Sequence, residues 1–192
     1  MKYDVILAGV GGQGVLSVAA CIATGAMKAG LAVRQSEVHG MAQRGGAVQA
    51  HLRLADRAIA SDLVPRGAAD MVLGMDPLES LRFLPYLAPD GVMVAAAEPF
   101  DNIPDYPDVG ELLAAIRRLP RYRLVDAAAL AREAGSARAA NIVLVGAASE
   151  FLPVGRGMLE AAVGEMFAGK GEAVVAANLK AFAAGLRQGG GA

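Results

Sequence analysis

The chain has 192 residues, which is enough for one domain with a substantial buried core and short for two. Apolar residues make up 55% and charged residues 19%, a balance that excludes an intrinsically disordered chain. A net charge of −1, with five Phe, four Tyr and no Trp, argues against general binding to nucleic acid or anionic membranes.

The first predicted elements are a strand at 3–8, a helix at 14–29 that ends before Gly30, and a strand at 31–37. This order is a βαβ unit and predicts parallel pairing of the two strands. Residues 5–27 carry no charge, but the Gly-Gly-Gln-Gly interruption argues against a membrane span. The start, MKYD, lacks the features of a signal peptide, so we expect a cytoplasmic protein.

The next segment, 47–54, alternates apolar residues with Gln49, His51 and Arg53. Such alternation predicts a strand with one dry face and one wet face. We therefore expect an edge or antiparallel strand beside a parallel core, with these three polar side chains in water.

Buried strands are predicted at 70–75 and 92–97, with a helix opening at Asp76-Pro77 between them. Three prolines and four carboxylates mark 98–108 as an exposed connection. The segments that follow are a helix at 109–119, a strand near 122–126, a helix from about 127, and helices from 139 onward that break at 155–157 and 169–171. The predicted fold is α/β and three-layered, with a Rossmann-like, mostly parallel sheet and a helical C-terminal third. Residues 1–187 are interpreted as a single domain and residues 188–192 as a flexible tail.

A glycine-rich turn joins the first strand to the first helix, and the glycines Gly9, Gly11 and Gly14 fit the pattern G-x-G-x-x-G. Glycine lets the backbone approach a ligand, and free N–H groups at a helix start attract anions. An NAD site needs an acidic residue at the end of the second strand, and Glu37 comes too late for it without a longer strand. Gly12 and Gln13 complete the turn. Three interpretations stay open: the turn faces a ligand or a partner, it serves only the packing of the fold, or it binds NAD(P) in a stand-alone protein.

The second polar stretch, 36–46, should follow the carboxyl end of the second strand, where open α/β sheets bind ligands. Its functional groups are an acid, an imidazole, an amide and a guanidinium, and it ends in two glycines: Glu37, His39, Gln43, Arg44, Gly45 and Gly46. Arg44 suits a phosphate or carboxylate, or else bridges to a local carboxylate in a solvated turn. We expect the two glycine turns to converge on one edge of the sheet.

Metal and covalent chemistry find little support in the sequence. The two histidines, His39 and His51, are not spaced as a helical metal pair, so no metal site is predicted. Cys21 is the only cysteine and is interpreted as a small buried apolar residue. One thiol forms no intrachain disulfide and cannot supply the four ligands of a cubane iron–sulfur cluster. No catalytic residue is assigned.

Together, the motifs GVGGQGVLSVA and SEVHGMAQRGG resemble the small (beta) subunit of indolepyruvate:ferredoxin oxidoreductases, within the gamma-domain family of 2-oxoacid:ferredoxin oxidoreductases. The resemblance covers nearly the whole chain, including DMVLGMDPLESLRFLPYL and NIVLVGAASEFLP. In that family the second motif often has Tyr and Glu where this chain has His39 and Gln43, a difference that looks like the arylpyruvate branch. A gamma subunit for pyruvate or 2-oxoglutarate is the alternative.

The resemblance implies CoA-dependent oxidative decarboxylation of a 2-oxoacid to acyl-CoA, CO2 and reduced ferredoxin. It also implies that thiamine diphosphate, Mg²⁺ and iron–sulfur clusters lie on a large (alpha) partner subunit, with ferredoxin reached through the complex. This chain would then be inactive alone. Its two glycine-rich turns would line a cleft and contact coenzyme A, the substrate or the partner subunit. In isolation, we expect the chain to self-associate as a homodimer through the apolar surface that the partner would otherwise cover.

Overall fold

The computed structural model describes residues 1–39, 46–100 and 103–188. Its strands are β1 Lys2–Val10, β2 Ala32–His39, β3 Ala47–Ala55, β4 Ala69–Gly74, β5 Leu87–Ala96 and β6 Tyr122–Val125. Its α-helices are α1 Val15–Lys28, α2 Pro77–Arg82, α3 Val109–Arg117, α4 Ala127–Glu133, α5 Ala140–Ala148, α6 Arg156–Phe167 and α7 Glu172–Leu186. Short 3-10 helices are η1 Leu84–Tyr86, η2 Ala137–Ala139 and η3 Ala168–Lys170.

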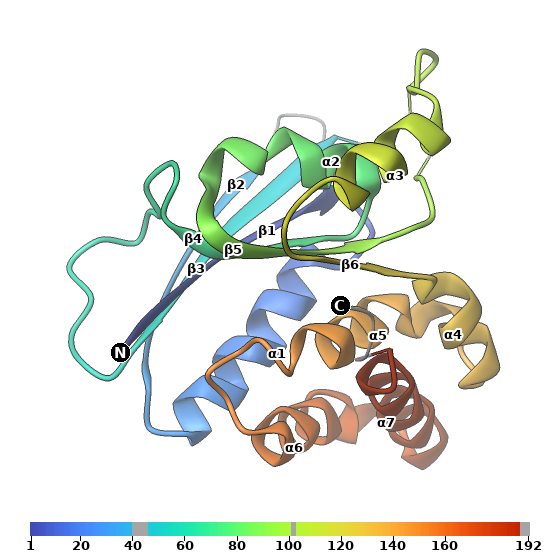
Figure 1. Ribbon diagram of the computed structural model, residues 1–192. Helices are drawn as coiled ribbons and strands as arrows, with labels where there is room; N and C mark the ends of the chain where they lie inside the picture. The colour runs from blue at the N-terminus through green and yellow to red at the C-terminus, as the bar shows by residue number, and fades with distance from the viewer. Residues whose placement is uncertain (40–45, 101–102, 189–192) are drawn as a thin grey trace.

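The strands form one six-stranded sheet in the order β2-β3-β1-β4-β5-β6. In Figure 1, α2 and α3 cover one face of the sheet, and α1 with α4 to α7 cover the other. Strands β1, β4, β5 and β6 pair in parallel, as is typical of a sheet with helices on both faces. The predicted three-layer α/β fold with a mostly parallel sheet and a helical C-terminal third is confirmed.

The pairing predicted for the first βαβ unit is wrong in one respect. β2 runs parallel to β1 but does not touch it, because β3 lies between them and pairs antiparallel with both. β3 is thus the antiparallel strand that the alternation predicted, although it is an interior strand and β2 forms the edge. The physical reason is the short connection after β2, which favours a hairpin-like return over a crossover.

The core lies on both faces of the sheet. The larger cluster packs the apolar side of β1 and β3 against α1 and α5, and includes Cys21, which is fully buried as expected. The smaller cluster, with Ile6, Val72 and Ile116, lies under α2 and α3. Burial raises the pKa of the Cys21 thiol to about 12, so this side chain behaves as an apolar residue.

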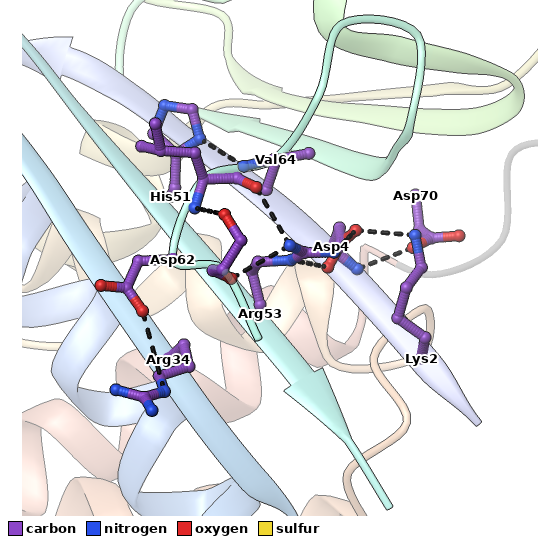
Figure 2. Close-up of polar contacts among 10 residues, drawn as sticks. Lys2, Asp4, Arg34, His51, Arg53, Asp62, Val64 and Asp70 are labelled. Carbon is purple, nitrogen blue, oxygen red and sulfur yellow. Dashed lines mark hydrogen bonds and ion pairs between the residues drawn. The ribbon is translucent and has the colours of Figure 1, made fainter. Parts of the chain in front are cut away.

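A connection at 56–68, between β3 and β4, covers the second face of β1 and β3 where no helix lies (Figure 2). Arg53 donates two hydrogen bonds to the buried carboxylate of Asp4, at 2.9 and 3.1 Å, and two more to the carbonyls of Ser61 and Leu63. The His51 ring lies under the same connection, and its Nδ1 accepts the N–H of Val64 at 3.0 Å.

The expectation that β3 has a wet face is therefore wrong for two of its polar residues. His51 is 3% exposed, and the side chain of Arg53 is 14% exposed. The alternation itself is real, but the connection at 56–68 folds back over this face and takes the place of solvent. A local pattern carries no information about such a distant segment.

Later elements follow the prediction closely. Asp76 caps α2, with its Oδ1 accepting the N–H of Glu79 at 2.9 Å and Pro77 in the first turn. Helices α5, α6 and α7 fill the C-terminal third, and Gly155 and Gly171 stand at the N-caps of α6 and α7. Within the part of the chain that the structure describes, no helix is long and apolar enough to cross a bilayer.

Candidate functional site at the carboxyl edge of the sheet

The glycine turn connects the carboxyl end of β1 to the start of α1. Gly12 and Gly14 have φ of 104° and 87°, a left-handed backbone that favours glycine. The side-chain amide of Gln13 accepts the N–H of Val10 at 2.7 Å through Oε1, and donates to the carbonyl of Met75 at 2.9 Å through Nε2. Gln13 therefore fixes the shape of the turn and ties it to the end of β4.

Two glycines of this turn have different surroundings. A Cβ at Gly9 would lie 2.9 Å from atoms of Gln13, Val15 and Met75, so Gly9 is required for close packing. A Cβ at Gly12 would meet nothing within 4 Å, and Gly12 is exposed. The backbone of Gly12 is accordingly the part of the turn that a ligand or a partner chain can reach.

The two glycine-rich turns meet, as the sequence predicted. The N–H of Gly11 donates to the carbonyl of Gly46 at 2.9 Å. Gly9 of β1 pairs with Val48 of β3, which pairs in turn with His39 at the end of β2. These three strand ends form one edge of the sheet.

Other residues of the second motif lie near that edge or outside the described part of the chain. Glu37, exposed on β2 opposite Ala50, accepts a hydrogen bond from Gln35 Nε2 at 2.6 Å. Gln43, Arg44 and Gly45 fall within 40–45, outside the described residues.

The start of α1 presents backbone amides next to a hollow. The first helical bond runs from Val18 N–H to the Gly14 carbonyl, so the amides of residues 15–17 precede it, and a glycine N-cap offers them no side-chain acceptor. The positive end of the helix dipole adds to the attraction for an anion. The first cavity, of about 310 Å³, is lined by Val10, Gly11, Gly12, Gly14, Val15, Leu16, Ser17 and Val48.

A second cavity, of about 280 Å³, opens on the other side of Gly12, toward β4 and β5. Its lining combines the glycine turn, the segment after β5 and the starts of α4 and α5: Gly12, Gln13, Met75, Ala96, Glu98, Pro99, Phe100, Ala127, Ala128, Ala137, Arg138, Ala140, Asn141 and Leu144. Both cavities thus lie at the carboxyl edge of the sheet, where α/β proteins bind ligands.

Glu98 is the acidic group of the second cavity. Its two oxygens accept the N–H groups of Ala127 and Ala128, at 3.2 and 2.7 Å. Burial raises the pKa of Glu98, and its hydrogen bond with Asp126 raises it further. The same bond lowers the pKa of Asp126, so Asp126 loses its proton more readily than Glu98 does.

Three residues at this edge escaped the sequence analysis as site residues: Asp76, Glu98 and Asn141. Asp76 was visible only as a helix cap, and Glu98 only as part of an exposed connection. The side chain of Asn141 lies under Gly14, with its Nδ2 2.6 Å from where a Cβ of that glycine would be. Its Oδ1 is buried and has no hydrogen-bond partner among the residues that the structure describes.

The described residues contain no group of side chains suited to hold a metal ion or an iron–sulfur cluster. Residues 1–39, 46–100 and 103–188 contain no cluster of three or more His, Cys, Asp or Glu side chains able to hold a metal ion. The single thiol of the sequence, Cys21, is buried in the core and cannot anchor an iron–sulfur cluster. No reaction step at such a group is therefore assigned to this chain.

Comparisons with known proteins give consistent results. Residues 4–188 match the family model described as pyruvate ferredoxin/flavodoxin oxidoreductase. Indolepyruvate oxidoreductase subunit IorB of Archaeoglobus fulgidus is 36% identical, over 98% of this chain and 96% of that relative. The corresponding subunit of Pyrococcus horikoshii is also 36% identical, over 78% of this chain and 77% of that relative.

Solved structures show the same fold. The gamma subunit of a keto/oxoacid ferredoxin oxidoreductase from Geobacter sulfurreducens aligns with a TM-score of 0.70 and 24% identity, over 97% of each chain. A 2-oxoglutarate:ferredoxin oxidoreductase from Magnetococcus marinus, solved with 2-oxoglutarate, coenzyme A and succinyl-CoA bound, aligns with a TM-score of 0.78 and 23% identity; the match covers 97% of this chain and 31% of that one. The chain belongs to the pyruvate ferredoxin/flavodoxin oxidoreductase family.

Proposed function

We propose that this chain is the small subunit of an indolepyruvate:ferredoxin oxidoreductase and that it acts in a cytoplasmic complex with a large subunit. The enzyme would convert an aryl 2-oxoacid and coenzyme A to acyl-CoA and CO2, passing the electrons one at a time to ferredoxin. Full-length similarity to indolepyruvate oxidoreductase subunits supports the assignment. The large subunit would hold thiamine diphosphate, Mg²⁺ and the clusters. In support of this division, the described residues of this chain contain no cluster of three or more metal-ligating side chains, and the single thiol of the sequence is buried.

The chain's own contribution would be a binding surface for coenzyme A. The observation that carries this proposal is the Gly11–Gly46 hydrogen bond, which joins the two glycine-rich turns beside the first cavity and the amides at the start of α1. Gly12, the next residue of the turn, lines both cavities. Backbone amides at a helix start suit phosphate, and coenzyme A brings phosphates to this reaction. Glu37, His39, Gln43, Arg44 and Gly45 belong to the same motif, and Arg44 would add a guanidinium for one phosphate.

Reconstitution of the chain with its large subunit tests the proposed reaction. The complex should reduce ferredoxin when indolepyruvate and coenzyme A are both present, and the isolated chain should not. Pyruvate and 2-oxoglutarate, offered under the same conditions, test the alternative of a subunit for another 2-oxoacid. Full activity of the isolated chain, or micromolar binding of NAD(H) to it by calorimetry, would contradict the proposal.

Replacement of Arg44 tests whether its guanidinium binds a phosphate of coenzyme A. Arg44→Ala in the complex should raise the KM for coenzyme A by about tenfold or more if the guanidinium binds a phosphate. Arg57→Ala is the matched control, because Arg57 is exposed on the connection after β3, at the opposite end of that strand from the glycine turns. Equal KM values for the two variants would remove Arg44 from the site.

A further inference from the structure

We propose that Asp76 is a positioning residue of the second cavity: its buried carboxylate holds the segment after β5 in place and so sets the wall formed by Glu98, Pro99 and Phe100. The predicted effect on coenzyme A rests on the function proposed above, whereas the structural part of the inference does not. Asp76 itself is not among the residues that line the cavity.

Among the described residues, the carboxylate of Asp76 accepts three hydrogen bonds while it is fully buried. Oδ1 accepts the N–H of Glu79 at 2.9 Å, which is an ordinary helix cap. Oδ2 accepts the N–H of Phe100 at 2.8 Å and the hydroxyl of Tyr106 at 2.7 Å. The second oxygen thus anchors residues 24 and 30 positions further along the chain.

Two other helix caps show that capping does not require this arrangement. Asp108 caps α3 and Asp126 caps α4, each through one oxygen that accepts one backbone N–H. Both residues are exposed, whereas Asp76 is 0% exposed. Burial of a carboxylate costs free energy unless both of its oxygens accept hydrogen bonds. The hydrogen bonds from Phe100 and Tyr106 therefore offset part of the cost of burying Asp76.

The same short segment also holds the opposite wall. Met75, which precedes Asp76, accepts a hydrogen bond from Gln13 Nε2 and donates its N–H to the Ala8 carbonyl at 2.8 Å. Residues 75–76 therefore connect the glycine turn on one side of the cavity to the Phe100 wall on the other. A change at Asp76 should move one wall relative to the other without removing any lining side chain.

Tyr106 is suited to this role because its hydroxyl keeps the proton that it donates to Asp76 Oδ2. Burial, together with the hydrogen bond to Asp76 and its charge, raises the pKa of Tyr106 far above its usual range. The phenol keeps its proton, and the donor to Oδ2 is present at any working pH.

Asp76→Asn is the sharpest test. One amide oxygen can still cap Glu79 N–H, while the amide nitrogen cannot accept from Phe100. Hydrogen exchange of the Phe100 amide, measured on the full chain, should become faster in this variant. In the reconstituted complex the KM for coenzyme A should rise by about threefold to tenfold with kcat nearly unchanged, since the wall would bind ligand without touching reacting atoms.

Two companion variants make the result interpretable. Tyr106→Phe removes a single bond to Oδ2 and should give a smaller change of the same kind, which guards against misfolding of the first variant. Asp108→Asn makes the same chemical change at a cap that lies outside the cavity lining. It should leave both Phe100 exchange and the KM at wild-type values.

The outcomes separate the inference from the proposed function. Unchanged Phe100 exchange in Asp76→Asn and in Tyr106→Phe would overturn the inference. Faster exchange with an unchanged KM would also overturn it, provided that Gly12→Ala still raises the KM for coenzyme A. If Gly12→Ala leaves that KM unchanged as well, the proposed coenzyme A surface fails, and with it the functional part of the inference.

Discussion

The two ends of β1 use polar groups in opposite ways. At its amino end, charged side chains bind one another and the connection at 56–68, as the Asp4–Arg53 pair and its neighbours show (Figure 2). At its carboxyl end, Gln13 binds backbone groups, and the amides at the start of α1 face a cavity. The charged cluster at the amino end therefore stabilises the fold, whereas the proposed binding surface at the carboxyl end consists largely of backbone groups.

Breaking the cluster at the amino end should have the largest effect on stability. Arg53→Met would leave the fully buried Asp4 with only the contact from Lys2 Nζ to compensate its charge, and should lower the free energy of unfolding by about 3 kcal/mol. Urea denaturation measures the loss. Arg34→Met, at an exposed pair with Asp62, is the control and should cost less than about 1 kcal/mol. An altered KM for coenzyme A in Arg53→Met would contradict the claim that the cluster at the amino end stabilises the fold without contributing to the proposed binding surface.

Removal of the Gln13 contacts at the carboxyl end of β1 should lower stability less than Arg53→Met does, and should weaken coenzyme A binding more. Gln13→Met removes the acceptor for Val10 N–H and the donor to the Met75 carbonyl, and should lower the free energy of unfolding by about 2 kcal/mol. It should also raise the KM for coenzyme A, because the turn loses its link to β4. Gln35→Met, at a partly buried position of β2 outside the glycine turn, should do neither. A Gln13→Met complex with wild-type KM would contradict the proposed role of the turn.

The amino-end cluster should also make the fold sensitive to acid. Burial, and then Arg53, lower the pKa of His51 below 6.5, so the unfolded chain takes up a proton more readily than the folded one. The stability gained from neutral His51 is fully present above pH 6.5 and is lost as the pH falls through the lower folded pKa.

Thermal unfolding measured from about pH 8 to about pH 5 checks this sign. His51→Asn keeps an acceptor for Val64 N–H but does not titrate, so its melting temperature should fall less over that range. Equal slopes for the two proteins would exclude His51 as the acid-sensitive group.

The smallest effect is expected at Glu98. Because its pKa is raised, the protonated carboxyl stabilises the fold fully below the unfolded pKa of 4.5, and that contribution is lost as the pH rises through the folded pKa. Glu98→Gln does not titrate and keeps one amide oxygen as an acceptor for the N–H of Ala127 or Ala128. Its melting temperature should therefore change less than that of wild type between acid and neutral pH. An equal pH dependence in the two proteins would exclude Glu98 as the titrating group.

Much of the fold could be predicted because it depends on local patterns. Buried strands between glycines and the Asp76-Pro77 cap gave the strands and helices of the parallel half. The place of β3 could not be read from its alternation, since an interior antiparallel strand and an edge strand share that pattern. The burial of His51 depends on the connection at 56–68, which no local pattern near residue 51 reveals.

One feature of the candidate site could likewise be predicted from the sequence, and another could not. The meeting of the two glycine turns followed from strand order, because carboxyl ends of parallel strands gather at one edge, and the Gly11–Gly46 bond confirms it. The further role of Asp76 depends on Phe100 and Tyr106 folding back onto it, a contact between distant segments. The sequence showed Asp76 as a cap and contained no sign of its second use.

The central claim, that the backbone of the glycine turn binds coenzyme A, is tested most directly by Gly12→Ala with Gly30→Ala as its control. Both glycines have a left-handed φ, 104° and 79°, and a Cβ at either meets nothing within 4 Å, so each variant should lose about 1 kcal/mol of stability from backbone strain. Only Gly12 lines the cavities, while Gly30 follows the far end of α1. The account predicts a KM for coenzyme A raised about tenfold in the Gly12→Ala complex alone. Equal KM values in the two variants would contradict it.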